Sequence, residues 1–398
     1  MPDEAPPLDG LRVLEIGSFI AGPFASQLLG DLGAEVAKIE PPGAGDPMRR
    51  WGVCRDGRSL WWPAIARNKQ SVAIDLRDER GRGLVGRIAE HVDVLIENFK
   101  PGTLARWGLG YEALAPANPG LVLVHVSGFG QTGPRAHEPG FGAIGEAVGG
   151  IRHTTGDPDR PPARTGISLG DSLAALFAVI GTLAAITERH RSGRGQEVDV
   201  AIYEAVFALM ESTVADYELG GVLRSRNGGV LDGVAPSNAY PTRDGHDVVI
   251  AANADAVFAR LAETMQRADL AAEFATHATR AARQAELDGE ITAWTAGLTA
   301  DEALGRLERA SVPSGLIHDA ADLASDPHFA ARDMILRVAA GFGRDLPMAG
   351  IVPKLSRSPG SVRSVGPELG AHTDAVLREL AGVTDDELRT LRDAGVIA

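Results

Sequence analysis

The sequence has one cysteine and shows no pattern typical of a metal site. Because Cys54 is the only cysteine among 398 residues, no disulfide can form within the chain, and we expect a reducing, cytoplasmic compartment. A zinc site built from several thiolates is excluded for the same reason. The ten histidines include no His-Glu-x-x-His pair, so we expect no metal cofactor.

Basic residues are also fewer than acidic ones. The 39 lysines and arginines face 53 aspartates and glutamates, for a net charge of −14. Such a chain is repelled by phosphate backbones and anionic lipids, so we expect no nucleic-acid partner and no membrane partner. The acidic, proline-rich residues 1–7 do not resemble a signal peptide. No apolar run looks long and uninterrupted enough to cross a bilayer.

The first half of the chain alternates predicted strands with predicted helices. This alternation predicts a parallel sheet in a doubly wound α/β domain. Ligands of such folds bind beyond the carboxyl ends of the strands, so the loops that begin at Gly17, Pro41, Asn98 and Gly128 are of interest. The predicted strands are 11–16, 35–40, 71–76, 92–97, 121–127 and 197–201, and the first helices are 22–32 and 80–90.

The later chain has a different texture. One amphipathic helix is predicted over 202–219, followed by a glycine-rich linker over 220–233 and a hairpin around Asp244-Gly245. Alanine-rich helices follow, and two late helices over 373–380 and 385–393 are positioned to return to the first domain. We therefore expect a large domain over 1–224, completed by 321–398, and a small α+β domain over 225–320.

Asp171 stands just before a long apolar helix predicted over 172–191. The simplest interpretation is a helix N-cap, which contributes about 1 kcal/mol. A second interpretation is a nucleophile, because a carboxylate beside backbone N–H groups and a positive helix end stays ionised and oriented.

Two short motifs suggest other chemistries and lack the required context. Gly128-Phe129-Gly130-Gln131-Thr132-Gly133 fits a dinucleotide fingerprint, but the prolines that follow cannot open the helix that carries a pyrophosphate. Gly166-Ile167-Ser168-Leu169-Gly170 fits the nucleophile elbow of serine hydrolases, with His318, His328 or His372 as triad partners. Arg-Pro-Pro-Ala-Arg precedes this second motif, where the elbow needs a buried strand.

Three segments could together hold an anionic ligand. Asn98 to Gly102 follows a predicted strand and could present backbone amides to phosphate. Arg106 lies in the next helix, and Arg77 follows a neighbouring strand. Each arginine alone is more often a solvated surface charge, but together they favour an anion site.

The order of these features resembles the family III CoA transferases, which include formyl-CoA transferase, carnitine CoA transferase and α-methylacyl-CoA racemase. The resemblance covers essentially the whole chain. The matching segments are Leu14-Glu15-Ile16, Ala21-Gly22-Pro23, residues 32–40, Asn68-Lys69, Asp75-Leu76, Glu97-Asn98-Phe99, Pro101-Gly102, Gly128-Phe129-Gly130, Gly170-Asp171 and residues 193–196.

This resemblance implies an interlocked, ring-like homodimer with a Rossmann-like large domain and a smaller α+β domain. It implies that Asp171 is the catalytic residue and that CoA, as acyl-CoA substrate, lies along one groove. A glycine loop over Gly228–Gly233 would cover the site. The groove residues implied by similarity are Ile20, Ala21, Ile74, Arg77, Asn98, Phe99, Arg106, Phe141 and Gly142.

At some positions this sequence differs from particular members of the family, and these differences disfavour some of the family's activities. Ile20 replaces a glutamine of formyl-CoA transferase, and Phe141-Gly142 replaces its tyrosine–glutamate pair, which disfavours oxalate. The histidine of the racemase also falls at Phe141, so a two-base proton exchange lacks one base. Residues 234–242 and 251–253 resemble the branch that uses succinyl-CoA and dicarboxylic acids. We expect CoA transfer from an acyl-CoA, with a racemase, a serine thioesterase or a non-catalytic CoA-binding protein as alternatives.

Overall fold

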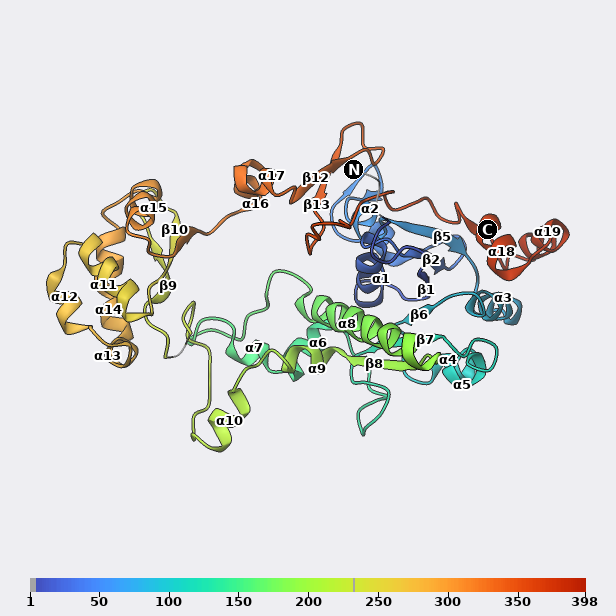
Figure 1. The fold of residues 1–398 in the computed structure, drawn as a ribbon, viewed down its shortest axis with the longest axis horizontal. Coiled ribbons are helices and arrows are strands. Elements are labelled where there is room, and N and C mark those ends of the chain that lie inside the picture. The colour runs from blue at the N-terminus through green and yellow to red at the C-terminus, as the bar shows by residue number, and fades with distance from the viewer. Residues whose placement is uncertain (1–4, 232) are drawn as a thin grey trace. The chain divides into compact units, whose positions relative to one another are not determined.

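The computed structural model describes residues 5–231 and 233–398 and divides into two compact units (Figure 1). The large unit contains the chain up to Ile151, then Thr165–Glu211 and Ala330–Ala398. The small unit contains Arg152–Arg164 and Ser212–Phe329. The small unit thus begins before residue 225 and ends after residue 320, so both of its bounds differ from those that we expected.

The large unit is built around six parallel strands in the order β5-β2-β1-β6-β7-β8. This confirms the predicted α/β class and its parallel sheet. Strand β1 lies at the centre, with β2 on one side and β6 on the other, so the order of the chain reverses at its carboxyl end. The strands are β1 Arg12–Glu15, β2 Glu35–Glu40, β5 Lys69–Ala73, β6 Val94–Glu97, β7 Val122–Ser127 and β8 Glu197–Ala201.

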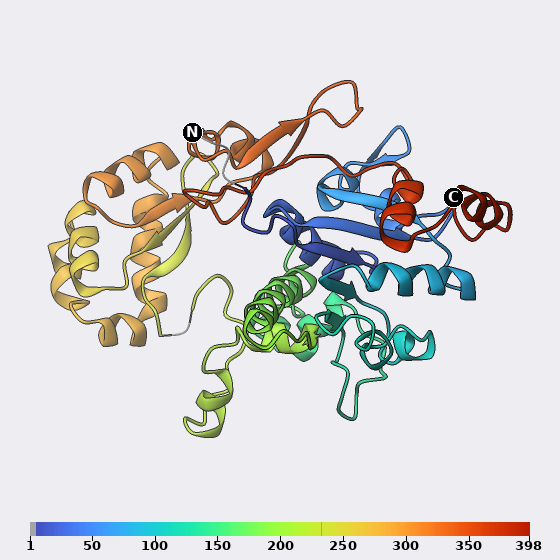
Figure 2. The same cartoon turned by 45° about the vertical axis from the view of Figure 1, so that its right-hand side comes forward.

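Both faces of this sheet are buried. Neighbouring side chains along a strand point to opposite sides, so each strand contributes to two cores. Val13 and Val36 join one core, and Leu14 and Ala37 join the other. The first core is closed by α1 (Ala21–Asp31), α8 (Leu169–Ser192) and α9 (Ile202–Phe207). The second is closed by α3 (Glu79–Ala89), α18 (Thr373–Ala381) and α19 (Asp385–Asp393). Figure 2 shows α8 and α18 on opposite sides of the sheet.

The remaining elements of the large unit are short. One group lies beside α1, where Trp62 and Met48 form a small core with Ile20, and a hairpin from the late chain packs on the same segment through Phe342. These elements are η1 Pro47–Arg50, β3 Cys54–Arg55, β4 Arg58–Ser59, α2 Trp62–Ile65, α4 Thr103–Arg106, α5 Tyr111–Leu114, α6 Gly142–Val148, β12 Ile335–Val338 and β13 Leu346–Ala349. Helices α7 Ile151–Thr154 and α17 Pro327–Ala331 span the bounds of the units.

The small unit pairs an antiparallel sheet, in the order β11-β10-β9, with helices that cover its core. The predicted hairpin around Asp244-Gly245 is confirmed by the pairing of β9 with β10. Its elements are α10 Thr213–Glu218, β9 Ser237–Pro241, β10 Asp247–Ala251, α11 Asp255–Thr264, α12 Ala268–Glu273, α13 His277–Ala282, α14 Gln284–Thr295, α15 Ala300–Arg309, β11 Ser314–Leu316 and α16 Ala320–Ser325.

The single helix predicted over 202–219 was wrong. Two helices, α9 and α10, replace it, and the chain leaves the large unit between them. Glu211 adopts a left-handed backbone with φ of 51°, which no regular helix accommodates. Periodicity alone did not reveal this break because both halves are amphipathic.

The expectation that no apolar run could span a bilayer also needs correction. Helix α8 is long and apolar enough by length and composition, with a mean hydropathy of 1.9 over 18 residues. Its alanines raise this value while they pack closely against β7, β8 and α1. A core helix of this composition meets the same criterion as a membrane span, and Ala174, Ala175 and Ala178 are fully buried in the sheet's core.

Candidate active site

Asp171 lies in the first turn of α8 rather than at its N-cap. The helix begins at Leu169, and Ser168 is the N-cap residue, without a side-chain capping bond. The predicted helix start at 172 was therefore wrong by three residues. The electrostatic argument still holds, because the third helical residue also lies at the positive end of the helix dipole.

The Asp171 carboxyl group packs directly on the backbone of Gly142, the first residue of α6. A Cβ atom placed on Gly142 would lie 2.7 Å from Cγ of Asp171 and 3.0 Å from its Oδ1. Any side chain at position 142 would therefore displace the carboxyl group. Asp171 is itself partly exposed, so the carboxylate is held on one side and accessible on another.

Glycines bring α6 this close to α8 and α9. A Cβ atom on Gly145 would lie 3.0 Å from Cβ of Ile202, and one on Gly149 would lie 2.7 Å from the backbone oxygen of Tyr203. On α8, a Cβ atom on Gly170 would lie 2.9 Å from the backbone oxygen of Gly142. The small residues of α6 are thus required by its close approach, which places its N-terminus against the start of α8.

Glu146 lies one turn after Gly142 on α6 and is buried, with 1% exposure. The backbone N–H of Gly170 donates to its Oε1 at 3.3 Å. The residue before Asp171 is thus bonded to an acidic side chain from another helix. Sequence reasoning missed Glu146, although its position four residues after Gly142 indicates the same face of α6.

The turn that follows β1 lies beside this site and is held by side chains from three other segments. Asn98, after β6, accepts from the Ser18 N–H at 2.9 Å and donates to the Ser18 oxygen at 2.7 Å. Lys38 donates to the Gly17 oxygen at 2.9 Å, and the Phe19 N–H donates to Asp46 at 3.3 Å. Asn98 therefore has a clear role within the protein: its amide fixes the backbone of Ser18.

Lys38 and Asp46 belong to a buried network of charges under this turn. Glu15 contacts Lys38 at 2.5 Å and Lys69 at 2.8 Å, and Lys38 also contacts Asp46 at 2.8 Å. Burial opposes the ionisation of Glu15, but the two lysines outweigh it and lower the pKa of Glu15 to about 2. Burial likewise opposes the charge of Lys38, but Glu15 and Asp46 raise its pKa above the ordinary value.

Three aromatic rings line the same edge of the site. Phe19 packs edge-on against Trp51 with ring centroids 5.3 Å apart, and edge-on against Phe141 at 6.4 Å. Phe141 directly precedes Gly142 and is 68% exposed. Phe19 has a left-handed backbone with φ of 65°, a conformation that such a residue adopts only when its surroundings enforce it. The contact between Phe19 and Trp51 has no sequence signal, because 31 residues separate them.

The other residues implied by the resemblance fall into two groups. Ile20, Ala21 and Ile74 are buried, so their side chains contribute packing. The rest follow β5 and β6: Arg77 and Phe99 lie on loops after these strands, and Arg106 is the last residue of α4. Arg77 is exposed and pairs with Asp75 at 2.7 Å, Phe99 packs edge-on against Trp107, and Arg106 donates to Thr103 at 2.9 Å.

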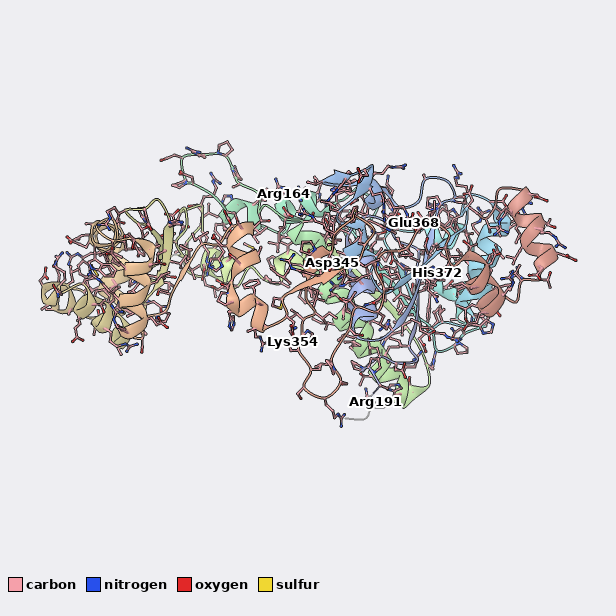
Figure 3. The ribbon with its side chains drawn as sticks, turned by 90° about the horizontal axis from the view of Figure 1, so that it is seen from above. Arg164, Arg191, Asp345, Lys354, Glu368 and His372 are labelled. Carbon is pink, nitrogen blue, oxygen red and sulfur yellow. The ribbon has the colours of Figure 1, made fainter. Side chains whose placement is uncertain are left out.

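The dinucleotide-like motif and the motif around Ser168 lack the neighbouring helix or strand that each chemistry requires. Residues 128–141 form a loop, so no helix follows the glycine-rich segment before Gly142. Residues 157–168 are loop rather than a strand before Ser168. Figure 3 shows His372 on the segment before α18, where its Nδ1 accepts from the Ser71 N–H at 3.2 Å. Within residues 5–231 and 233–398, no three His, Cys, Asp or Glu side chains are grouped as a metal ion requires.

Comparisons with known proteins place the chain in a family. The family model described as CoA-transferase family III matches residues 8–373. A succinyl-CoA–D-citramalate CoA-transferase from Chloroflexus aurantiacus is 54% identical over 394 residues, which are 98% of each chain. The alpha subunit of a succinyl-CoA–L-malate CoA-transferase from the same organism is 40% identical, over 98% of this chain and 92% of that one.

A solved structure supports the same assignment. The crystal structure of a CaiB/BaiF family protein from Brucella suis has a TM-score of 0.83 and 34% identity, and the match covers 95% of this chain and all of that one. This protein belongs to CoA-transferase family III. It is therefore an enzyme of CoA transfer, and CoA thioesters are its substrates.

Proposed function

We propose that this protein moves CoA from succinyl-CoA to a dicarboxylic acid, with Asp171 as the covalent carrier. The observation that supports this most strongly is the position of Asp171 in a family III CoA-transferase: first turn of α8, against the backbone of Gly142, and partly exposed. A carboxylate in that position is oriented by the start of a helix and accessible, as a nucleophile must be. Relatives named for succinyl-CoA with citramalate and malate support the substrate classes.

The reaction proceeds in four acyl-transfer steps. The Asp171 carboxylate attacks the thioester carbonyl of succinyl-CoA, which breaks the C–S bond and leaves a mixed anhydride and CoA thiolate. The thiolate attacks the Asp171 carbonyl of the anhydride, which releases succinate and leaves an aspartyl-CoA thioester. The acceptor carboxylate attacks this thioester and forms a second anhydride, again with release of thiolate. The thiolate then takes the acceptor acyl group and restores the Asp171 carboxylate.

Each step develops negative charge on a carbonyl oxygen, which hydrogen-bond donors must stabilise. The turn over Gly17–Ala21 is our candidate for these donors, because Asn98, Lys38 and Asp46 hold its backbone in place. The glycine loop over Gly228–Gly233, which we expected to cover the site, includes residue 232, which lies outside the described residues. Arg77 and Arg106, after β5 and β6, are proposed to bind the phosphates of CoA.

We also propose that the active protein is an interlocked homodimer. The support within one chain is apolar surface on the helices of the large unit. Leu176 and Ile180 on α8 are 46% and 60% exposed, and Phe207 at the end of α9 is 52% exposed. Large apolar side chains exposed together on neighbouring helices are typical of a surface that another chain covers. Sedimentation of the purified protein would test this, and a monomer that transfers CoA would contradict it.

Replacing Asp171 tests the proposed function. Asp171→Ala should lower CoA transfer from succinyl-CoA to a panel of dicarboxylic acids by at least about 1,000-fold, because the carrier is lost. Free CoA should still bind, since the groove residues are unchanged. Asp301→Ala removes a first-turn aspartate of α15 in the small unit and should leave transfer unchanged. Appreciable turnover by a folded Asp171→Ala protein would contradict the proposal.

A further inference from the structure

The start of α8 has an unusual source of capping. The first N–H groups of a helix have no partner within it and are normally bonded by the N-cap side chain. Here Ser168 makes no such bond with its side chain. The Gly170 N–H instead donates to Glu146 on α6, at 3.3 Å, and Glu146 is 1% exposed.

The neighbouring glycines make this contact possible. A Cβ atom on Gly170 would lie 3.2 Å from Cγ of Glu146, closer than most side chains tolerate. On α6, Gly142 contacts the Asp171 carboxyl group, and Glu146 contacts the preceding residue, Gly170. Residues four apart lie on one face of a helix, about 6 Å from each other along its axis. One face of α6 therefore contacts two consecutive residues of α8.

We propose that Glu146 is a positioning residue for Asp171. Its carboxylate fixes the Gly170 peptide, and this peptide leads directly into the backbone of the nucleophile. Without the bond, the first turn of α8 is free to fray, and the Asp171 carboxyl group no longer has a single position on Gly142. A misplacement of about 1 Å at a reacting group costs on the order of 100-fold in rate.

The proposal requires that residue 146 offers a hydrogen-bond acceptor to the Gly170 N–H. The variants Glu146→Gln and Glu146→Ala should therefore differ in activity. Glu146→Gln keeps an oxygen for the Gly170 N–H, and Glu146→Ala removes it. We expect kcat to fall about 10- to 100-fold in Glu146→Ala and less than about threefold in Glu146→Gln. The KM for succinyl-CoA and the Kd for free CoA should change less than about twofold in both, because Glu146 is buried and bonded to the helix of the proposed nucleophile.

A second readout reports the bond itself. Hydrogen exchange of the peptide that contains Gly170 should accelerate in Glu146→Ala and remain near the wild-type rate in Glu146→Gln. Glu188→Ala is the matched control, because Glu188 accepts a bond from Ser192 at the other end of α8. That variant should change neither kcat nor exchange at Gly170.

The inference rests on the proposed function, and the two can fail separately. An active Asp171→Ala protein would remove the proposed function whatever Glu146 does. With Asp171 confirmed, a folded Glu146→Ala protein with wild-type kcat would overturn the inference. So would a folded Glu146→Gln protein as slow as Glu146→Ala, or a loss expressed in the KM for succinyl-CoA instead of kcat.

Discussion

The large unit holds two acidic side chains, Glu15 and Asp171, in opposite ways. Glu15 is fully buried under the turn after β1 and is held by Lys38 and Lys69. Asp171 is partly exposed at the start of α8 and is held against the backbone of Gly142. Burial between two cations makes a carboxylate a fixed structural charge, whereas an accessible helix start leaves one side of it open to a substrate.

Two different kinds of interaction hold the parts of the site in place. The network of Glu15, Lys38 and Asp46 holds the Gly17–Phe19 backbone, and glycines on α6 and α8 hold Asp171. The first arrangement depends on charge and the second on the absence of side chains. Substitutions in the charge network and substitutions of the glycines should therefore differ in their effects on stability and on kcat.

The largest effect on stability is expected from Glu15→Gln. This change removes the carboxylate that pairs with Lys69 and one of the two that pair with Lys38, and breaking a buried ion pair in this way costs about 3–5 kcal/mol in the free energy of unfolding. Urea denaturation would measure it. Glu379→Gln removes an exposed partner of Arg12 and should cost less than about 1 kcal/mol. Equal losses for the two variants would contradict the structural role of the buried network.

Gly142→Ala should damage catalysis and leave the buried network intact. Its methyl group would overlap the position of the Asp171 carboxyl group, so we expect kcat to fall about 100-fold. Steady-state kinetics and a thermal melt would separate this from unfolding. Gly83→Ala, where a Cβ atom meets nothing within 4 Å, should retain full activity and gain about 0.5–1 kcal/mol in stability. A fully active Gly142→Ala protein would show that Asp171 is not held as described.

Asn98→Ala should have smaller effects, both on kcat and on stability. It removes both bonds to the Ser18 backbone, so we expect about a tenfold lower kcat and a loss of about 1–2 kcal/mol in the free energy of unfolding. Asn118→Ala removes two comparable bonds, to the oxygens of Ala89 and Val92. That control should lose similar stability with unchanged kcat. If both variants were equally active, the turn after β1 would have no part in catalysis.

The last expected effect is on the pH dependence of stability. The pKa of Glu15 is lowered from 4.5 to about 2, because Lys38 and Lys69 outweigh its burial. A carboxyl group with a depressed folded pKa stabilises the protein fully above its unfolded pKa and loses this contribution as the pH falls. The free energy of unfolding should therefore decline between about pH 4.5 and 2 more steeply in the wild type than in Glu15→Gln. Parallel curves would contradict the role assigned to Glu15.

The sequence predicted elements whose signals are local. Strands β2 and β8 have the predicted bounds, and the Asp244-Gly245 turn joins β9 to β10 as expected, because period and turn chemistry are encoded in neighbouring residues. The broken helix at Glu211 escaped prediction, because a left-handed residue between two amphipathic segments leaves the apolar period unchanged.

Only part of the candidate site could be predicted, because only some of its residues have a signal in neighbouring residues. Asp171 was proposed from its position before an apolar helix and from the family resemblance, and it lies in the first turn of α8 rather than at the N-cap that we predicted. Glu146, Phe19 and Asp46 were missed because the contacts that bring them to the site, Gly170 with Glu146 and Phe19 with Asp46, join residues 24 and 27 positions apart, and only the folded chain brings them together. The glycine spacing of α6 was the one available sign of a close helix contact.

The central claim is that the acyl and CoA groups pass through the carboxylate of Asp171. The most direct measurement is mass spectrometry of the protein digested after incubation with succinyl-CoA and an excess of acceptor. We predict an added CoA mass on the peptide that contains Asp171, and no such mass in Asp171→Ala. An adduct on Ser168, or catalysis without any adduct on this peptide, would contradict the claim.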